Sequence, residues 1–484
     1  MLSPIGRSRA AWVAACAGLA LVYFTGLAGV GLVGPDEPRY ASIGRAMADA
    51  GDWVTPKLWG EAWFEKPALL YWMIALGHRA GLGPEWGPRL PVAILSMLFL
   101  WFYHSALRRE FGAPAAGFAA AVLATSAGWI AFSQVAVTDL PMAAAFSAAM
   151  LLALRWIGTG SRRTLAAAGA LLGVAVLAKG LVPLVLAAPL AWFGRRRVRE
   201  ILPGAGAFLV VAVPWYALCW LRNGQVFFDQ FFWRHHFERF GSESLAHRQP
   251  FWFYAPVLLA GLFPWTPLAA HLFGRGLLRG WRRQLLVVWV LFGFVFFSAS
   301  TNKLPGYLLP LMPALCALMG IALAETRRPR WSLAACGLLL GLIPVVAAAL
   351  PDLLIAGLRR ADLGAPGWVW IAMAVPVWFL ERRGRRLAAV ALVAAGVGAG
   401  ILWIKLAALP GADARMTARP LWRAVAPRAG EVCVEPIHRA WRYGLNYYSR
   451  EPLPDCAVAP RPLRIRQRPG NMPAIERGAE VNSP

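Results

Sequence analysis

Residues 11–33, AWVAACAGLALVYFTGLAGVGLV, form a run of 23 residues without a charged side chain. A helix of about 20 apolar residues is long enough to cross the hydrocarbon core of a bilayer. The run could be mistaken for a secretory leader, but it is longer than a leader's apolar region and no A-x-A cleavage pattern stands at its end. We therefore interpret it as a membrane-spanning helix.

Apolar stretches of this kind recur along most of the chain. Of its 484 residues, 58% are hydrophobic and only 15% are charged, which lies outside the range of water-soluble proteins. The sequence therefore predicts an all-α polytopic membrane protein. We place about thirteen spans, at residues 11–33, 87–107, 115–133, 139–157, 164–179, 181–193, 201–221, 252–272, 284–299, 304–322, 331–350, 366–380 and 387–407.

The basic residues give these spans a direction. The net charge is +25, but the Lys and Arg residues cluster between apolar runs and are not interleaved with polar readout residues, so we expect no nucleic-acid partner. If the N-terminus lies in the cytoplasm, every cytoplasmic loop is basic, as the positive-inside rule requires. Residues 164–193 could be one long tilted helix, but a break at Lys179 and Gly180 keeps the arginines of residues 195–199 inside.

The outer side then receives residues 34–86 and the tail from residue 408, with most acidic, His and Trp residues outside the helices. Residues 38–50 and 68–81 are predicted as short helices on the membrane surface. We divide the chain into a membrane domain, 1–410, and a small outer domain or tail, 411–484. The tail has one strand-like run, residues 431–436, and is either a solvated appendage or attracted to anionic headgroups. An oxidising compartment would permit a Cys433–Cys456 disulfide, but the sequence leaves this pairing open.

Two charged motifs lie in the first outer loop. GPDEPRY (34–40) follows the first span, and FEKP (64–67) comes after GDWVTPKLWG (51–60). These motifs closely resemble the bacterial transferases that move 4-amino-4-deoxy-L-arabinose from undecaprenyl phosphate to lipid A, and more distantly the protein O-mannosyltransferases. The resemblance covers roughly residues 10 to 325. Further matches follow in the same order: Thr138-Asp139, Ala178-Lys179-Gly180, FFW-x-x-H-x-x-RF (231–240), PFWFY (250–254) and KLP-x-Y (303–307).

The resemblance implies a C-type membrane glycosyltransferase with thirteen spans in a bacterial inner membrane. Its N-terminus would be cytoplasmic, and its site and C-terminus would be periplasmic. The implied donor is a sugar on polyprenyl phosphate, and the acceptor is lipid A or another envelope molecule. The preferred pair is undecaprenyl-phosphate 4-amino-4-deoxy-L-arabinose and lipid A. The tail is shorter than the outer domain that this pair leads us to expect, so protein O-mannosylation and transfer of another sugar to lipopolysaccharide remain alternatives.

Several basic residues lie at or near the outer face, where the positive-inside rule alone would not place them. Transfer from a glycosyl phosphate needs cations that hold the phosphate and stabilise it as a leaving group. Snorkelling to headgroups would explain any one of these residues taken alone. The resemblance implies that the lipid phosphate is bound by Lys66, Lys179, Arg239, Lys303 and the Tyr307 hydroxyl, with Arg39 supporting the site.

The resemblance marks Asp36 as the catalytic carboxylate, with Glu37 beside it and Asp139 as a second carboxylate near the site. For a hydroxyl acceptor, Asp36 would act as a general base. A lipid A phosphate is already anionic, so Asp36 would instead position it. Asp139 could also cap the fourth span, since Pro141 follows it closely.

Glu65 and His236 match family positions that can share a divalent cation such as zinc. Two ligands are too few to specify a metal site, and a lone His near an interface is more often an amphipathic anchor. His235 and Arg234 also depart from the pattern, since an acidic residue is expected before His236. The sequence therefore establishes no required cofactor and leaves a divalent cation such as zinc at Glu65 and His236 as an open alternative.

A rival hypothesis from another class is a non-catalytic lipid or solute transporter. Such a protein predicts paired repeats and ionisable residues near the middle of the membrane. We find no clear repeat between the halves of the chain, and the charged residues favour the edges of the spans. No P-loop pattern is present, which fits an enzyme whose donor is not a nucleotide sugar.

Overall fold

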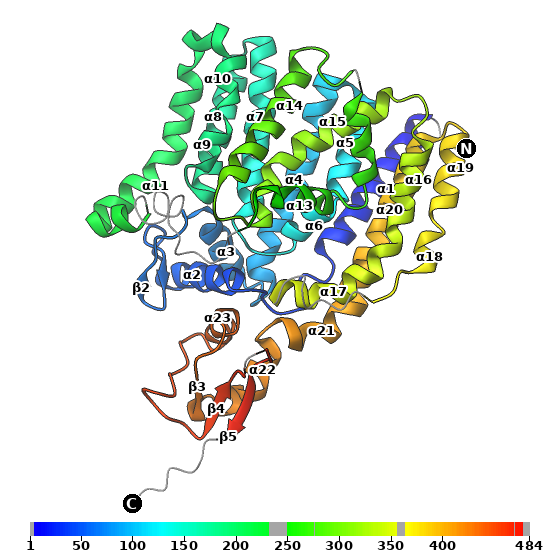
Figure 1. The fold of residues 1–484 in the computed structure, drawn as a ribbon. Coiled ribbons are helices and arrows are strands. Elements are labelled where there is room, and N and C mark those ends of the chain that lie inside the picture. The colour runs from blue at the N-terminus through cyan, green and yellow to red at the C-terminus, as the bar shows by residue number, and fades with distance from the viewer. Residues whose placement is uncertain (1–3, 232–248, 275, 356–363, 469, 478–484) are drawn as a thin grey trace, which may run out of the picture.

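The computed structural model describes residues 4–231, 249–274, 276–355, 364–468 and 470–477, and most of them are helical. Long helices run side by side, and a small domain lies beyond one end of them (Figure 1). The helices of the first half are α1 (Pro4–Phe24), α2 (Asp36–Ala50), α3 (Leu69–Arg79), α4 (Trp86–Phe111), α5 (Ala113–Ala124), α6 (Ala127–Ser133), α7 (Asp139–Thr159), α8 (Arg162–Lys179), α9 (Val182–Leu186), α10 (Pro189–Phe193) and α11 (Leu202–Phe228). Those of the second half are α13 (Tyr254–Gly261), α14 (Trp281–Ala299), α15 (Met312–Glu325), α16 (Arg330–Leu339), α17 (Ile343–Ile355), α18 (Trp368–Ile371), α19 (Ala374–Arg382), α20 (Arg386–Trp403), α21 (Leu409–Met416), α22 (Arg419–Val425) and α23 (Arg439–Tyr448).

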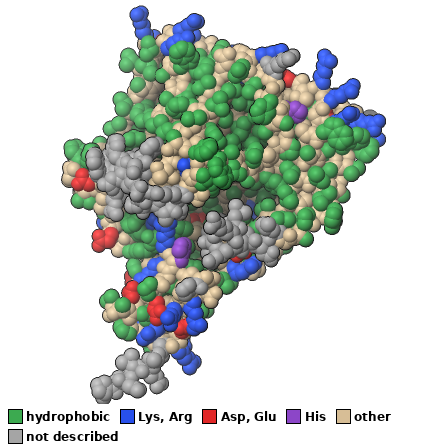
Figure 2. Space-filling model, viewed as in Figure 1, with side chains coloured by type: hydrophobic (Ala, Val, Ile, Leu, Met, Phe, Trp, Pro, Cys, Tyr) green, Lys and Arg blue, Asp and Glu red, His purple; other side chains and the backbone are tan. Residues whose placement is uncertain are grey.

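Seven helices in the described part of the chain are long and apolar enough to cross a membrane, or up to nine if two bent pairs each count as one span. Figure 2 shows hydrophobic side chains covering the helical body, with Lys and Arg side chains at its upper edge and on the small domain. Exposed apolar side chains on these helices suit contact with lipid. The prediction of a polytopic all-α membrane protein is confirmed. The seven helices are Trp86–Phe111, Asp139–Thr159, Leu202–Phe231, Trp281–Ala299, Pro305–Glu325, Arg330–Leu353 and Arg386–Met416.

The first predicted span is too long at its C-terminal end. Helix α1 ends at Phe24, and Gly26 follows in the left-handed region (φ 71°), so the apolar residues up to 33 form a partly buried loop. Lys405 supports this ending, because its Nζ donates to the carbonyl oxygens of Val22 (2.7 Å) and Thr25 (2.8 Å). A lysine amine thus satisfies carbonyl groups that the helix end leaves unpaired.

Other local predictions agree with the structure. The short helices predicted at 38–50 and 68–81 correspond to α2 and α3, which lie across the lower end of the bundle (Figure 1). Their close contact needs Gly44, where a Cβ atom would meet the Ile74 side chain at 2.5 Å. The predicted break after Lys179 is also present, because α8 ends there and Gly180 has a φ of 82°.

The small domain follows α21 and has a core of its own. Strands β3 (Val432–Val434), β4 (Leu463–Arg466) and β5 (Ala474–Arg477) form one sheet, in which β3 and β4 are parallel and β4 and β5 are antiparallel. The side chains of Val432, Trp441, Leu445 and Ile465 are buried between the sheet and the helices α22 and α23. The strand predicted at 431–436 is therefore confirmed.

A disulfide joins Cys433 and Cys456, which resolves the pairing that the sequence left open. Their separation is 23 residues, and closing a loop of this size in the unfolded chain stabilises a domain by about 3 kcal/mol. We expect Cys433→Ser to lower the stability of the small domain by about that amount. Limited proteolysis measures this, because cleavage in the domain should become faster. A control, Cys16→Ser, removes an exposed free cysteine and should leave the cleavage rate unchanged.

Candidate active site

A buried ion pair holds the loop that leads into α2. The guanidinium of Arg89 is 2% exposed and donates to the carbonyl oxygens of Leu27 (2.6 Å), Val30 (2.9 Å) and Gly31 (2.7 Å). It also makes two hydrogen bonds of 2.7 Å to the carboxylate of Glu37. Bidentate pairs of this kind fix orientation as well as charge. The position of the loop therefore depends on Arg89.

Glu37 is enclosed in this network. Its side chain is 0% exposed, and its carboxylate also accepts hydrogen bonds from the backbone N–H of Val33 (2.7 Å) and of Ala136 (2.9 Å). The bond to Ala136 brings the start of α2 next to the segment that leads into α7. Glu37 thus joins three segments that are distant in sequence, and its buried carboxylate accepts hydrogen bonds from all of them.

The side chain of Asp36 points away from the buried pair of Arg89 and Glu37. Its side chain is 47% exposed, and its Oδ1 accepts a hydrogen bond of 2.6 Å from Arg39, one turn further along α2. The same Arg39 contacts Glu65 at 2.9 Å, and the other carboxylate oxygen of Glu65 lies 3.5 Å from Lys66. Four of the predicted residues, Asp36, Arg39, Glu65 and Lys66, therefore form one continuous charged cluster.

The aromatic residues beside this cluster remain neutral. Burial raises the pKa of the Tyr40 and Tyr71 hydroxyls, and the carboxylates of Asp36 and Glu65 raise it further. Burial alone would lower the pKa of Arg39, but Glu65 and Asp36 outweigh it, so the pKa is raised and the charge is permanent. The cluster thus keeps one fixed cation between two carboxylates.

A second cluster forms where α7 begins and α8 ends. Lys179 Nζ lies 2.6 Å from Asp139 Oδ1 and 4.8 Å from the centre of the Tyr307 ring. The N-cap of α7 is Thr138, without a side-chain capping bond, so the carboxylate of Asp139 serves the ion pair. Tyr307 lies in the 3-10 turn Pro305–Leu311. Three segments far apart in sequence therefore meet at this cluster.

The two clusters lie at the same end of the bundle. Glu37, next to Asp36, bonds the backbone of Ala136, three residues before Asp139. Phe64, next to Glu65, packs in one apolar cluster with Leu177, two residues before Lys179. The structure thus brings together most of the residues that the resemblance marks.

Gly306 lies directly against the carboxylate of Asp139. A Cβ atom at this position would lie 2.2 Å from Asp139 Oδ1 and 2.9 Å from Phe132 Cε1. We expect Gly306→Ala to displace the carboxylate and weaken the Lys179 pair, at a stability loss of about 1–3 kcal/mol. Thermal unfolding in detergent measures this. The control Gly411→Ala adds a methyl group in a helix with nothing within 4 Å and should be neutral or slightly stabilising.

Other predicted residues are placed differently or not described. Lys303 is 5% exposed, and its Nζ donates to the backbone carbonyl oxygens of Ser300 and, at 3.2 Å, of Gln249. Its amine therefore links two loops in this structure. Arg239 and His236 lie outside the described residues.

The described residues do not make a metal site. Within the described ranges, no group of three or more His, Cys, Asp or Glu residues could hold an ion. The two carboxylate oxygens of Glu65 face Arg39 and Lys66, and such cations disfavour a metal at the same oxygens. His236, the other predicted ligand, lies outside the described residues, so a metal at Glu65 and His236 stays a prediction.

Sequence reasoning missed Arg89 and Tyr443. Arg89 lies at the outer end of the predicted span 87–107. A charged residue at that position favours a buried ion pair, and the carboxylates of the outer loop are its nearest candidates. Tyr443 lies in the small domain, yet its ring centre is 5.6 Å from Arg39 Cζ. Nothing in its local sequence indicates this contact.

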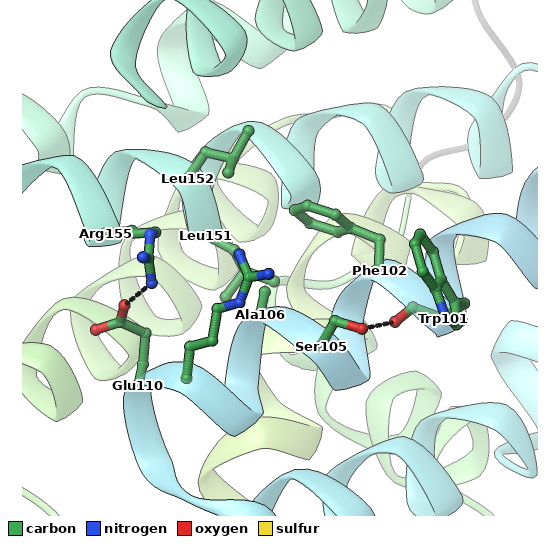
Figure 3. A pocket seen from close by; sticks show the side chains of 9 residues that line it. Trp101, Phe102, Ser105, Ala106, Glu110, Leu151, Leu152 and Arg155 are labelled. Atoms are coloured by element: carbon green, nitrogen blue, oxygen red, sulfur yellow. Dashed lines mark hydrogen bonds and ion pairs between the residues drawn. The ribbon is translucent and has the colours of Figure 1, made fainter. Parts of the chain in front are cut away.

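A groove at the opposite end of α4 and α7 is separate from the site. It has a volume of about 120 Å³, and Figure 3 shows Phe102 and Leu152 at its apolar part and Arg155 bonded to Glu110 at its polar part. Glu110 also accepts a hydrogen bond of 2.8 Å from Arg282 on α14. Glu110 therefore links the far ends of three helices, and the groove, which α4 and α7 line, contributes no residue to the two charged clusters.

Comparisons with known proteins point to one family of enzymes. The family described as dolichyl-phosphate-mannose-protein mannosyltransferase matches residues 65–220. The undecaprenyl phosphate-alpha-4-amino-4-deoxy-L-arabinose arabinosyl transferase of Pseudomonas paraeruginosa is 35% identical over 367 residues, which are 71% of this chain and 65% of that protein. The protein of the same name from Serratia proteamaculans is 32% identical over 62% of this chain and 57% of its own length. The chain thus spans 65% and 57% of the lengths of these two relatives, less than two thirds of each.

Solved structures extend the similarity over nearly the whole chain. The crystal structure of ArnT from Cupriavidus metallidurans bound to undecaprenyl phosphate superposes with a TM-score of 0.74 at 30% identity, covering 92% of this chain and 85% of that one. Arabinosyltransferase EmbB from Mycobacterium smegmatis has a TM-score of 0.50 at 15% identity and shares the fold alone.

Proposed function

The chain belongs to the ArnT-like family of glycosyltransferases, and we propose on this basis that it moves a sugar from a polyprenyl-phosphate donor to an acceptor in the cell envelope. The preferred pair is undecaprenyl-phosphate 4-amino-4-deoxy-L-arabinose and a phosphate of lipid A. The half-exposed Asp36 carboxylate, held by Arg39 at the same end of the bundle as Lys179, carries this proposal. The relatives' names and the undecaprenyl phosphate in the related crystal structure support the choice of donor.

The cations act on the donor phosphate. Lys66, Lys179 and the Tyr307 hydroxyl bind the phosphate that links the sugar to its lipid, and they stabilise the charge that grows on it as it leaves. Asp139 keeps the amine of Lys179 in place through their 2.6 Å contact. Arg239 and Lys303 remain predicted phosphate ligands.

The acceptor attacks the sugar from the side opposite the phosphate. An oxygen of the acceptor forms a bond to the anomeric carbon while the bond from that carbon to the phosphate oxygen breaks, so the configuration inverts. A phosphate acceptor needs no deprotonation, and Asp36 then orients it through the acceptor's hydrogen-bonding groups. For a hydroxyl acceptor, Asp36 takes the proton. Glu37 acts indirectly, because its buried pair with Arg89 positions the start of α2.

The topology proposed here has thirteen spans within residues 1–410, in the inner membrane of a bacterium, with a cytoplasmic N-terminus. Residues 411–484 form a periplasmic domain next to the site. Two observations support this direction. The Lys and Arg side chains at the upper edge of the bundle lie opposite the site (Figure 2), as expected for a cytoplasmic edge. The Cys433–Cys456 disulfide suits an oxidising compartment.

Mass spectrometry of lipid A tests the proposed pair. Cells that contain the protein should produce lipid A with one additional aminopentose, and cells without it should not. In a reconstituted system, the purified protein should transfer the same sugar from undecaprenyl phosphate to lipid A. Unmodified lipid A in both experiments would reject the pair. The match to mannosyltransferases favours protein O-mannosylation as the second candidate, which sugar analysis of envelope proteins from the same cells would detect.

A further inference from the structure

The small domain reaches the site through one face of α23. The hydroxyl of Tyr447 donates a hydrogen bond of 2.7 Å to the carbonyl oxygen of Pro84, and Arg45 on α2 donates one of 2.9 Å to the carbonyl oxygen of Tyr447. These contacts hold α23 against α2 (Figure 1). Tyr443 precedes Tyr447 by four residues and so lies on the same side of the helix, toward the site.

Tyr443 contacts both the charged cluster and an aromatic hairpin. Its ring centre lies 5.6 Å from Arg39 Cζ and 5.5 Å from the ring centre of Trp59. The ring of Trp63 is 5.7 Å from the same Arg39 Cζ. Arg39 in turn holds Asp36 at 2.6 Å. The rings of Tyr443 and Trp63, which come from two domains, therefore flank the cation that orients the proposed catalytic carboxylate, and Trp59 packs on Tyr443.

Trp59 occupies a backbone position that is unfavourable for it. Strands β1 (Lys57–Leu58) and β2 (Glu61–Ala62) form a hairpin whose two-residue loop is Trp59 and Gly60, both with positive φ (52° and 89°). Such loops prefer Asn or Gly, and a bulky residue in the left-handed region is destabilising. A tryptophan at this position suggests a role for its indole ring.

Two donors in this cluster have no partner. The indole nitrogens Nε1 of Trp59 and of Trp63 are buried, and neither makes a hydrogen bond within the described part of the chain. Buried donors without partners are rare, so the two indole nitrogens mark a place where the fold leaves hydrogen bonds unmade. The rings of Trp59, Trp63 and Tyr443 are partly exposed, and the C–H face of a sugar ring packs on such aromatic rings.

We propose that Trp59, Trp63 and Tyr443 form a binding site for a sugar ring of the acceptor glycolipid. The proposal rests on the proposed function and adds the role of the small domain in it. Contacts along the cluster run from Lys66 to Glu65, then to Arg39 and then to Tyr443. The aromatic group is therefore at the end of the cluster away from Lys66, a proposed ligand of the donor phosphate. The sugar next to Tyr443 accordingly belongs to the acceptor.

Steady-state transfer to lipid A, with the variants Trp59→Asn and Tyr443→Ala, tests the proposal. Each should raise the KM for lipid A about tenfold, the equivalent of losing one aromatic contact, while the Kd for undecaprenyl phosphate stays unchanged. Trp59→Asn should also keep or raise the melting temperature, because Asn suits the loop. A loss of activity through misfolding would instead lower it. Tyr443→Phe keeps the ring and should retain the wild-type KM.

The matched control is Arg450→Asn. Arg450 is exposed and is the second non-glycine residue with positive φ (67°) within the described ranges. The Arg450→Asn variant should gain stability in the same way as Trp59→Asn and leave the KM for lipid A unchanged. An unchanged KM for lipid A in Trp59→Asn and Tyr443→Ala would overturn the proposed sugar site, as would a change confined to the Kd for undecaprenyl phosphate. Failure of the wild-type protein to transfer sugar to lipid A would reject the proposed function itself.

Discussion

Asp36→Asn is expected to lower the rate of sugar transfer by about a hundredfold for a phosphate acceptor, which the carboxylate orients, and by about a hundred- to ten-thousand-fold for a hydroxyl acceptor, whose proton it takes. The reason lies in the geometry of α2. Asp36 is the one carboxylate of the adjacent pair that is exposed, and Arg39 holds it from one side only. The amide of Asn keeps an oxygen for Arg39 but loses the negative charge, so the fold should be retained.

Purified protein in lipid vesicles, with labelled donor, measures this loss. Binding of undecaprenyl phosphate should remain at the wild-type level, because its proposed ligands are unchanged. The matched control is Asp49→Asn on the same helix, whose carboxylate is 63% exposed and contacts His78. It should transfer at the wild-type rate. Full activity of Asp36→Asn would contradict the assignment of Asp36 as the catalytic carboxylate.

The largest expected effect on stability comes from Arg89→Met. It leaves the carboxylate of Glu37 buried without its cation and three carbonyl groups without their donor. Removing one partner of a buried pair typically destabilises a protein by about 3–5 kcal/mol. Thermal unfolding in a single detergent should therefore show a clear fall in the melting temperature.

Two further variants make this result specific. Arg222→Met breaks an ion pair with Asp52 in which the arginine is 57% exposed, and such pairs are worth about 0–1 kcal/mol. The double variant Arg89→Met with Glu37→Gln removes the isolated charge and should recover part of the lost stability. Equal melting temperatures for Arg89→Met and Arg222→Met would show that the pair does not hold the loop.

For Asp36 and Glu37, the sequence did not predict which side chain is buried. The two residues are adjacent, and both looked like candidates for catalysis after the first span. In the structure one side chain faces outward to Arg39, and the other is enclosed by Arg89, 52 positions further along the chain. Neighbouring side chains on a helix point in different directions, and only the packing of distant segments decides which direction is buried.

The sequence by itself determined that the chain is a polytopic helical membrane protein, where its surface helices and the break after Lys179 lie, and which motifs mark the family. These features follow from apolar length, glycine and charge position, which act locally on each segment. The tertiary structure alone decided the early end of α1, the pairing of Asp139 with Lys179 and the approach of Tyr443 to Arg39. Tyr443 and Arg39 belong to different domains, so their contact depends on how α23 packs on α2, and no local pattern in the chain encodes that packing.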